Sequence, residues 1–127
     1  DRKTKSSIQT LSVDDLPPHD VLVKVAYSTL NYKDGLAITG RGRICRRLPM
    51  VGGIDLAGTV VSNASPNDTT FKEGDRVLVN GFGLGETEWG GYSGYAKLKP
   101  EWLVHVPEAF SLEQAMGIGT AGYTSML

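Results

Sequence analysis

The strongest indication of the fold is a predicted β-strand in the segment Val21-Leu22-Val23-Lys24-Val25-Ala26-Tyr27. In an extended chain, every second side chain from Val21 to Tyr27 lies on one face, and these are three valines and a tyrosine. A strand with one apolar face has to pack that face on a core. The two prolines in residues 16–20 fix the backbone and remove hydrogen-bond donors, which predicts a turn before the strand.

Further short strands are expected on both sides of this one, separated by glycine and proline turns. They are residues 8–13, 53–61, 76–80, 94–98 and 103–106. Ala57 and Gly58 are small, which indicates that two backbones approach closely at this point. Short strands at this spacing predict a barrel or a sandwich, in one β-rich domain that covers nearly the whole chain.

The last part of the chain is expected to be helical. Ser111 and Gln114 fit a capping box, which predicts a helix over residues 112–116. Gly117 and Gly119 are expected to interrupt it, and Thr120 to cap a second helix that runs to the end of the chain. The apolar residues at this end predict that the chain continues in a longer parent protein.

Composition excludes several functional classes. The chain has 127 residues, 13 Lys and Arg against 14 Asp and Glu, and 40% hydrophobic residues. This near-balanced charge disfavours a nucleic-acid binder, and no apolar run reaches the ~20 residues that a membrane span needs. The single cysteine, Cys45, cannot form an internal disulfide, which favours a reducing, cytoplasmic setting.

Two clusters of polar residues are candidates for a site. Asn31-Tyr32-Lys33-Asp34 follows the strongest strand, and these four side chains can hold a ligand or simply form a helix start, with Asn31 as N-cap and Asp34 at N3. Arginines lie in the segment that follows, and they form either a solvated loop or a phosphate clamp. They are Arg41, Arg43, Arg46 and Arg47.

Other conspicuous residues receive smaller roles. The glycine-rich residues 80–91 match neither a P-loop nor a dinucleotide motif; Phe82 and Trp89 either line a ligand or belong to a plain hairpin loop. His19 and His105 are interpreted as structural. Neighbouring arginines are expected to lower the pKa of Cys45, but no local histidine makes it a nucleophile, so it has no assigned role.

Several segments together resemble a known superfamily. Residues 30–40 (LNYKDGLAITG), 53–60 (GIDLAGTV) and 74–77 (GDRV) resemble the medium-chain dehydrogenases/reductases. Residues 46–50, 89–91 and 118–124 narrow the resemblance to the zinc-free branch of acrylyl-CoA reductases and quinone oxidoreductases. Each segment is short, but the ordered set covers nearly the whole chain.

The resemblance implies a mainly β fold, the GroES-like, partly open β-barrel of the catalytic domain, over residues 1–115. Residues 116–127 would begin the Rossmann α/β nucleotide-binding domain. The resemblance also implies that the full-length protein is a homodimer. Zinc-dependent relatives have a cysteine where this chain has Asn31 and a histidine where it has Ile54. Neither residue is a good zinc ligand, so we expect no metal.

The resemblance further implies that NADPH transfers a hydride to the β-carbon of an enoyl-CoA thioester, converting acrylyl-CoA to propionyl-CoA. Asn31 would donate to a carbonyl oxygen, Tyr32 would contact the cofactor or relay a proton, and Asp34 would orient the turn. These three are the catalytic candidates. Tyr32, Gly35 and Thr120 are the cofactor-binding candidates, with Gly35 allowing close approach of the backbone.

Local charge, and not the resemblance, makes the four arginines candidates for binding the CoA phosphates.

Two alternative functions stay open: a zinc-free quinone oxidoreductase, which needs no phosphate clamp, and a stand-alone barrel that binds a partner without redox chemistry. A Gly-x-x-Gly-x-x-Gly motif in a strand–turn–helix unit after Leu127 would favour the enzyme. We expect the 127-residue chain alone to be inactive, because it holds only half of a cofactor site.

Overall fold

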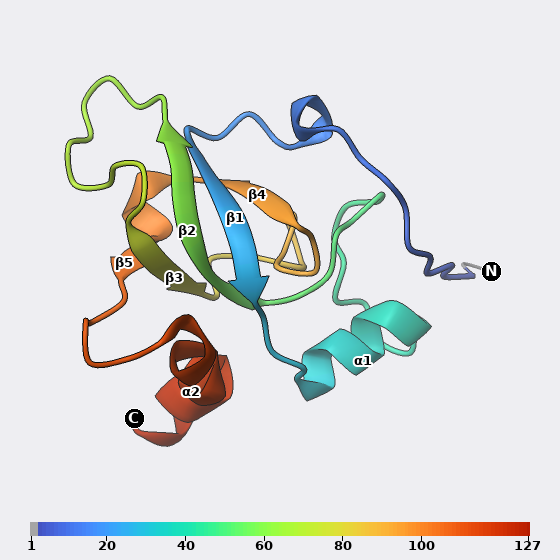
Figure 1. Cartoon of the computed structure of the whole chain (residues 1–127). Helices are drawn as coiled ribbons and strands as arrows, with labels where there is room; N and C mark the ends of the chain where they lie inside the picture. The colour runs from blue at the N-terminus through green and yellow to red at the C-terminus, as the bar shows by residue number, and fades with distance from the viewer. Residues whose placement is uncertain (1–2) are drawn as a thin grey trace.

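The computed structural model describes residues 3–127, which form an open antiparallel sheet with two helices at one end of it (Figure 1). The strand order is β4-β1-β2-β3-β5, and all four neighbouring pairs are antiparallel. The strands are β1 (Val21–Tyr27), β2 (Asp55–Asn63), β3 (Arg76–Asn80), β4 (Tyr95–Leu98) and β5 (Val104–His105). The fold is mainly β and the sheet is not closed, in agreement with the expected partly open barrel.

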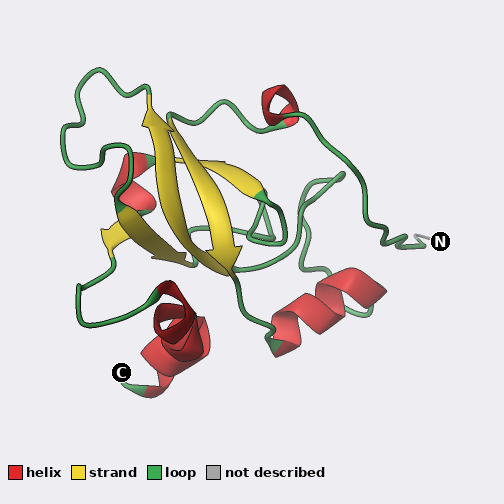
Figure 2. Ribbon diagram, in the orientation of Figure 1, coloured by secondary structure: helices red, strands yellow, loops and turns green. Residues whose placement is uncertain are grey.

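Helices are few and short (Figure 2). They are the α-helices α1 (Tyr32–Thr39) and α2 (Leu112–Ser125) and the 3₁₀ turns η1 (Val13–Asp15) and η2 (Pro100–Trp102). Both α-helices lie at the end of the sheet where β1 ends and β2 begins (Figure 1). No helix among residues 3–127 is both long and apolar enough to cross a membrane.

The core explains why the sheet forms. Val21 and Val23 are fully buried, as their alternation predicted, and they pack with Leu56, Val77 and other buried side chains. Val25 is only half-buried and Tyr27 is exposed, so the apolar face of β1 is confined to its first half. A second small cluster joins α2 to the sheet. It consists of Ala57, Val106, Ala115 and Met116.

Close packing at Gly58 is confirmed. A Cβ atom at this position would lie within van der Waals overlap of the Lys24 carbonyl oxygen on β1. Only glycine allows this approach between β1 and β2.

One expected strand is absent. Residues 8–13 form no strand; instead, Ser12 caps η1, and its backbone N–H donates to the Asp15 carboxylate at 2.9 Å. Local side-chain hydrogen bonds compete with strand pairing in this segment, and Ile8 is fully exposed.

The C-terminal helix is longer than expected. Ser111 and Gln114 form the predicted capping box, with Gln114 N–H donating to Ser111 Oγ at 3.1 Å. The helix passes through Gly117 and bends at Gly119, where φ is 52° and ψ is −162°. The expected end at residue 116 is therefore wrong, because Gly117 is accommodated in the helix. The interruption expected at Gly119 and the second helical segment after it are confirmed. The hydroxyl of Thr120, expected to cap a second helix, instead donates to Asp55 at 2.8 Å.

Candidate functional site

The link from β1 to α1 forms the predicted helix start. Asn31 is the N-cap of α1, and Asp34 is at N3. The Asp34 carboxylate accepts the Asn31 backbone N–H at 2.8 Å and is 3% exposed. The side chain of Asn31 points back along the chain, where its Nδ2 donates to Thr29 Oγ1 at 2.6 Å. Asp34 therefore orients the turn, and the Asn31 amide belongs to a second network.

The centre of that network is Asp55, the first residue of β2, which is 0% exposed. Its Oδ1 accepts the Thr29 N–H at 3.1 Å, and the Thr29 hydroxyl is 2.7 Å from both carboxylate oxygens. Its Oδ2 accepts the Thr120 N–H at 3.1 Å and the Thr120 hydroxyl at 2.8 Å. Asp55 thus joins the end of β1, the start of β2 and the bend of α2.

The geometry around Thr120 shows where its hydroxyl proton goes. The Thr120 oxygen is 2.8 Å from Asp55 Oδ2 but 3.3 Å from Asn80 Oδ1. A hydroxyl has one proton, so the shorter contact, to the carboxylate, is the hydrogen bond. Among residues 3–127, neither Asp34 nor Asp55 forms an ion pair, so hydrogen-bond donors and no cation stabilise the buried charge of Asp55.

Tyr92 borders the same site, although the sequence did not indicate it. Its hydroxyl donates to the Thr29 carbonyl oxygen at 2.7 Å, and its ring lies over Gly52 and Gly53. Burial and the neighbouring carboxylates of Asp34 and Asp55 raise the pKa of Tyr92 above its ordinary value of 10.0. The Tyr92 hydroxyl, beside the start of α1, therefore keeps its proton at pH values where an ordinary tyrosine begins to lose it.

The outer side of this site is open. Tyr32 is 84% exposed and Leu30 is 80% exposed, directly beside the buried network. Gly35 has open space where a side chain would stand. Tyr32 and Gly35 are thus accessible beside a hydrogen-bonded base, and their role in binding a ligand stays a prediction.

Comparison with known proteins identifies the family. Residues 17–108 match the model of the alcohol dehydrogenase GroES-like domain. The chain belongs to this family, within the medium-chain dehydrogenase/reductase superfamily.

Individual relatives of this GroES-like domain are larger proteins. The chain is 50% identical over 127 residues to a probable acrylyl-CoA reductase, AcuI, of Escherichia coli, of which it covers 38%. It is 50% identical over 120 residues, 94% of its length, to a putative quinone oxidoreductase, YhfP, of Bacillus subtilis, of which it covers 36%. Among solved structures, the yhdH oxidoreductase of Salmonella enterica in complex with NADP matches with a TM-score of 0.92 and 50% identity, over 98% of this chain and 37% of that one.

The arginine cluster of this GroES-like domain lies apart from the Asp55 network. All four side chains are exposed in the loop between α1 and β2. The loop is attached to the glycine-rich segment, because Arg46 N–H donates to the Glu86 carbonyl at 2.8 Å. Lys33 Nζ on α1 forms a 2.6 Å ion pair with the carboxylate of the same residue. The guanidinium groups are therefore free to contact a ligand, and their role stays a prediction.

The pKa of the Cys45 thiol differs from expectation. Burial raises the pKa of its thiol, where the nearby arginines had been expected to lower it. The arginine side chains point into solvent, so their charge is screened, and desolvation dominates.

The two histidines have the structural contacts expected of them. The ring of His19 lies 2.9 Å from the Glu88 carboxylate, and the ring of His105 lies 3.1 Å from the Thr70 carbonyl. Within residues 3–127, no group of three or more His, Cys, Asp and Glu side chains could hold a metal ion.

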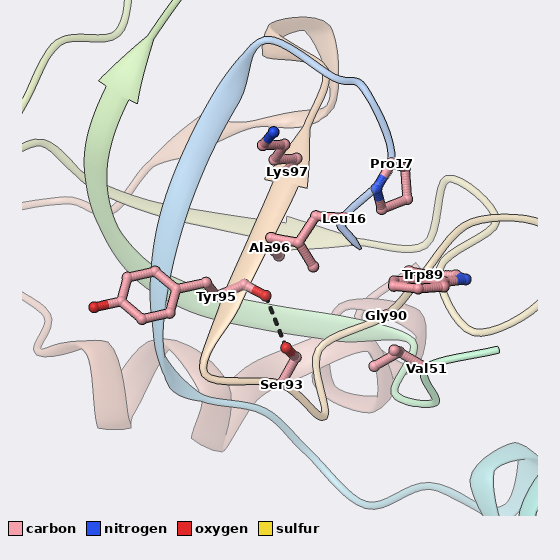
Figure 3. Close-up of a pocket in the computed structure, with 9 residues that line it drawn as sticks. All are labelled: Leu16, Pro17, Val51, Trp89, Gly90, Ser93, Tyr95, Ala96 and Lys97. Atoms are coloured by element: carbon pink, nitrogen blue, oxygen red, sulfur yellow. Dashed lines mark hydrogen bonds between the residues drawn. The ribbon is translucent and has the colours of Figure 1, made fainter. Parts of the chain in front are cut away.

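The aromatic residues of the glycine-rich loop make protein contacts. Phe82 stacks on Trp102 with ring centroids 6.2 Å apart, and the Trp89 indole donates to the Pro49 carbonyl at 3.1 Å. Trp89 lines a shallow depression between β4 and the segment before β1 (Figure 3). The depression encloses a cavity volume of about 0 Å³, so it cannot hold a ligand and is not the candidate site.

Proposed function

We propose that this GroES-like domain is the catalytic-domain part of a longer reductase that uses NADPH to reduce the C=C bond of an enoyl-CoA thioester, with acrylyl-CoA as substrate. One observation carries the proposal. Asn31 and Thr120, expected on the substrate and cofactor sides, lie far apart in the sequence but are joined to one buried carboxylate, Thr120 directly and Asn31 through Thr29. The 50% identity to a probable acrylyl-CoA reductase supports the choice of substrate.

The residues of the open wall fit a nicotinamide cofactor. Gly35 leaves room for a ring or ribose to approach the backbone of α1, and Tyr32 is exposed beside it. When bound, NADPH supplies the hydride. The protein positions the thioester and stabilises the negative charge that develops on its carbonyl oxygen, and Asn31 is the donor that we assign to this oxygen.

Tyr32 is assigned to the cofactor side. Its hydroxyl contacts NADPH or passes a proton, and replacement by phenylalanine should lower turnover without unfolding the protein, because the side chain makes few contacts with the core. Unchanged turnover and NADPH affinity in Tyr32→Phe would remove this residue from the site.

A quinone is the competing substrate, because one close relative bears the name of a putative quinone oxidoreductase. We propose that the arginines select CoA, since a quinone has no phosphates to bind. Replacing Arg46 and Arg47 by alanine should raise KM for acrylyl-CoA and leave KM for a quinone unchanged. An unchanged KM for acrylyl-CoA would contradict a role of these arginines in CoA binding. Lys97→Ala, on the edge strand β4, is the control for loss of positive charge elsewhere on the domain.

The direct test of the proposal is NADPH oxidation by the full-length protein that contains this chain. Acrylyl-CoA should support turnover with a higher kcat/KM than a quinone under the same conditions. Turnover with the quinone alone would favour the competing enzyme, and the absence of both activities would favour a non-catalytic binding module.

Further properties belong to the same proposal. The domain boundary is near residues 115 and 116, and the full-length protein is a cytoplasmic homodimer.

The reaction needs no zinc, because asparagine and isoleucine occupy the positions of the ligands in zinc-dependent relatives. Prolonged dialysis against EDTA should therefore leave turnover unchanged, and loss of activity that zinc restores would contradict it.

A further inference from the structure

The hydroxyl of Thr29 has two different partners and a single proton. Its oxygen is 2.7 Å from both oxygens of the Asp55 carboxylate and 2.6 Å from Nδ2 of Asn31. An ionised carboxylate only accepts hydrogen bonds, so the Thr29 proton goes to Asp55. Thr29 can then only accept from Asn31, and the amide has to turn its nitrogen toward it.

We propose that Asp55 is a positioning residue that determines, through Thr29, which end of the Asn31 amide faces the ligand. The inference rests on the proposed function for its catalytic consequence, but the amide orientation stands on the hydrogen bonds alone. Nδ2 has two N–H groups, and one of them donates to Thr29. The second N–H is then the donor left for a ligand, and the carbonyl oxygen is kept at the other end of the amide.

Removing the hydroxyl would release this constraint. A carboxamide can rotate by half a turn with little change in shape, which exchanges its donor and acceptor ends. Without Thr29 Oγ1, the Asn31 amide loses the acceptor that holds its nitrogen end. A donor aimed at a developing negative charge would then be replaced, part of the time, by an oxygen that repels it.

Burying the Asp55 carboxylate costs free energy, and the positioning of Asn31 through Thr29 explains why a carboxylate lies here. A wholly buried carboxylate with no cationic partner among residues 3–127 is unfavourable unless donors surround it. Here the donors come from Thr29 and Thr120, so the same charge fixes the β1–α1 link and the bend of α2 relative to each other. An apolar residue at position 55 could fill the core but could not orient either group.

The decisive variant is Thr29→Val in the full-length protein, because valine keeps the shape of threonine and leaves the bonds from Thr120 to Asp55 in place. We expect kcat/KM with acrylyl-CoA to fall by about tenfold to a hundredfold, the range between loss of a neutral hydrogen bond and loss of an oxyanion donor. Thr29→Ser keeps the hydroxyl and should restore activity. Ser28→Ala removes a 2.7 Å hydrogen bond to the main chain of Asp55 and should have little effect.

A double-mutant cycle separates positioning from general loosening. If Thr29 acts through Asn31, Thr29→Val should have no further effect on kcat/KM in an Asn31→Ala background. Equal effects of Thr29→Val in both backgrounds would overturn the proposal, because they would show that Thr29 acts independently of the amide.

An NMR measurement on the ligand-free protein tests the orientation without any activity. With asparagine selectively labelled with ¹⁵N, the Asn31 side-chain amide should show one proton at low field, hydrogen-bonded to Thr29. This shift should persist in Thr29→Ser and Ser28→Ala and disappear in Thr29→Val. An unchanged Asn31 resonance in Thr29→Val would refute the inference. If the resonances behave as expected and the protein does not reduce enoyl-CoA, the proposed function fails while the amide orientation stands.

Discussion

Replacement by alanine should change the stability of the fold in opposite directions at two glycines of α2, Gly117 and Gly119. Gly119 has φ 52° and ψ −162°, a backbone conformation that is nearly restricted to glycine and costs other residues about 1–3 kcal/mol. A Cβ atom there would lie 2.8 Å from Thr29 Cγ2 and 3.3 Å from Asp55 Oδ2. Overpacking adds roughly 1–3 kcal/mol. Gly119→Ala should therefore destabilise the fold by about 2–6 kcal/mol.

Gly117 is the matched control. An added methyl group at this position would have no other part of the chain within 4 Å, and the residue lies in the helical part of α2. Alanine at this position should stabilise the helix by roughly 0.5–1 kcal/mol, because glycine loses more backbone entropy on folding. Urea unfolding of the chain and the two variants, followed by far-ultraviolet circular dichroism, measures both. A Gly119→Ala variant as stable as the unaltered chain, or a Gly117→Ala variant as unstable as Gly119→Ala, would refute the reasoning.

Three further predictions follow from the charges and titrating groups. Because the pKa of Tyr92 is raised in the folded state, its contribution to stability is present below pH 10.0 and is lost as the pH rises above it; Tyr92→Phe should reduce the alkaline loss of stability, measured by urea unfolding between about pH 9 and 11. Because the pKa of Cys45 is raised by burial, its thiol should react with a disulfide reagent at about pH 8 more slowly than free cysteine, and faster reaction would contradict the assigned environment. The ion pair of Lys33 with Glu86 is partly exposed, so Lys33→Ala should cost at most about 1 kcal/mol in unfolding measurements.

The sequence was sufficient for the elements whose pattern is local. Residues 21–27 and 76–80 carry apolar side chains at every second position, and both strands begin and end where expected. The start of α1, with Asn31 as N-cap and Asp34 at N3, and the capping box at Ser111 also depend only on neighbours in the chain. The segment 8–13 has strand-forming residues but no partner strand, and pairing is a property that the local pattern does not contain.

The site was only partly predictable for a related reason. Asn31, Asp34 and Thr120 were singled out, but the group that joins Asn31 to Thr120 is Asp55, which had been noted only within a family motif. A carboxylate directly between Ile54 and Leu56, at the start of a buried strand, is the signal that could have identified it. Its donors come from residues 26 and 65 positions away, so only the fold shows that they converge.

The most direct test of the central claim is to follow the hydride. The full-length protein would be incubated with acrylyl-CoA and NADPH carrying deuterium in place of both hydrogens at C4 of the nicotinamide. The CoA product would be analysed by mass spectrometry and NMR. The account predicts propionyl-CoA with one deuterium, located at the β-carbon. Propionyl-CoA without deuterium, deuterium at the α-carbon, or no reduced CoA product at all would contradict it.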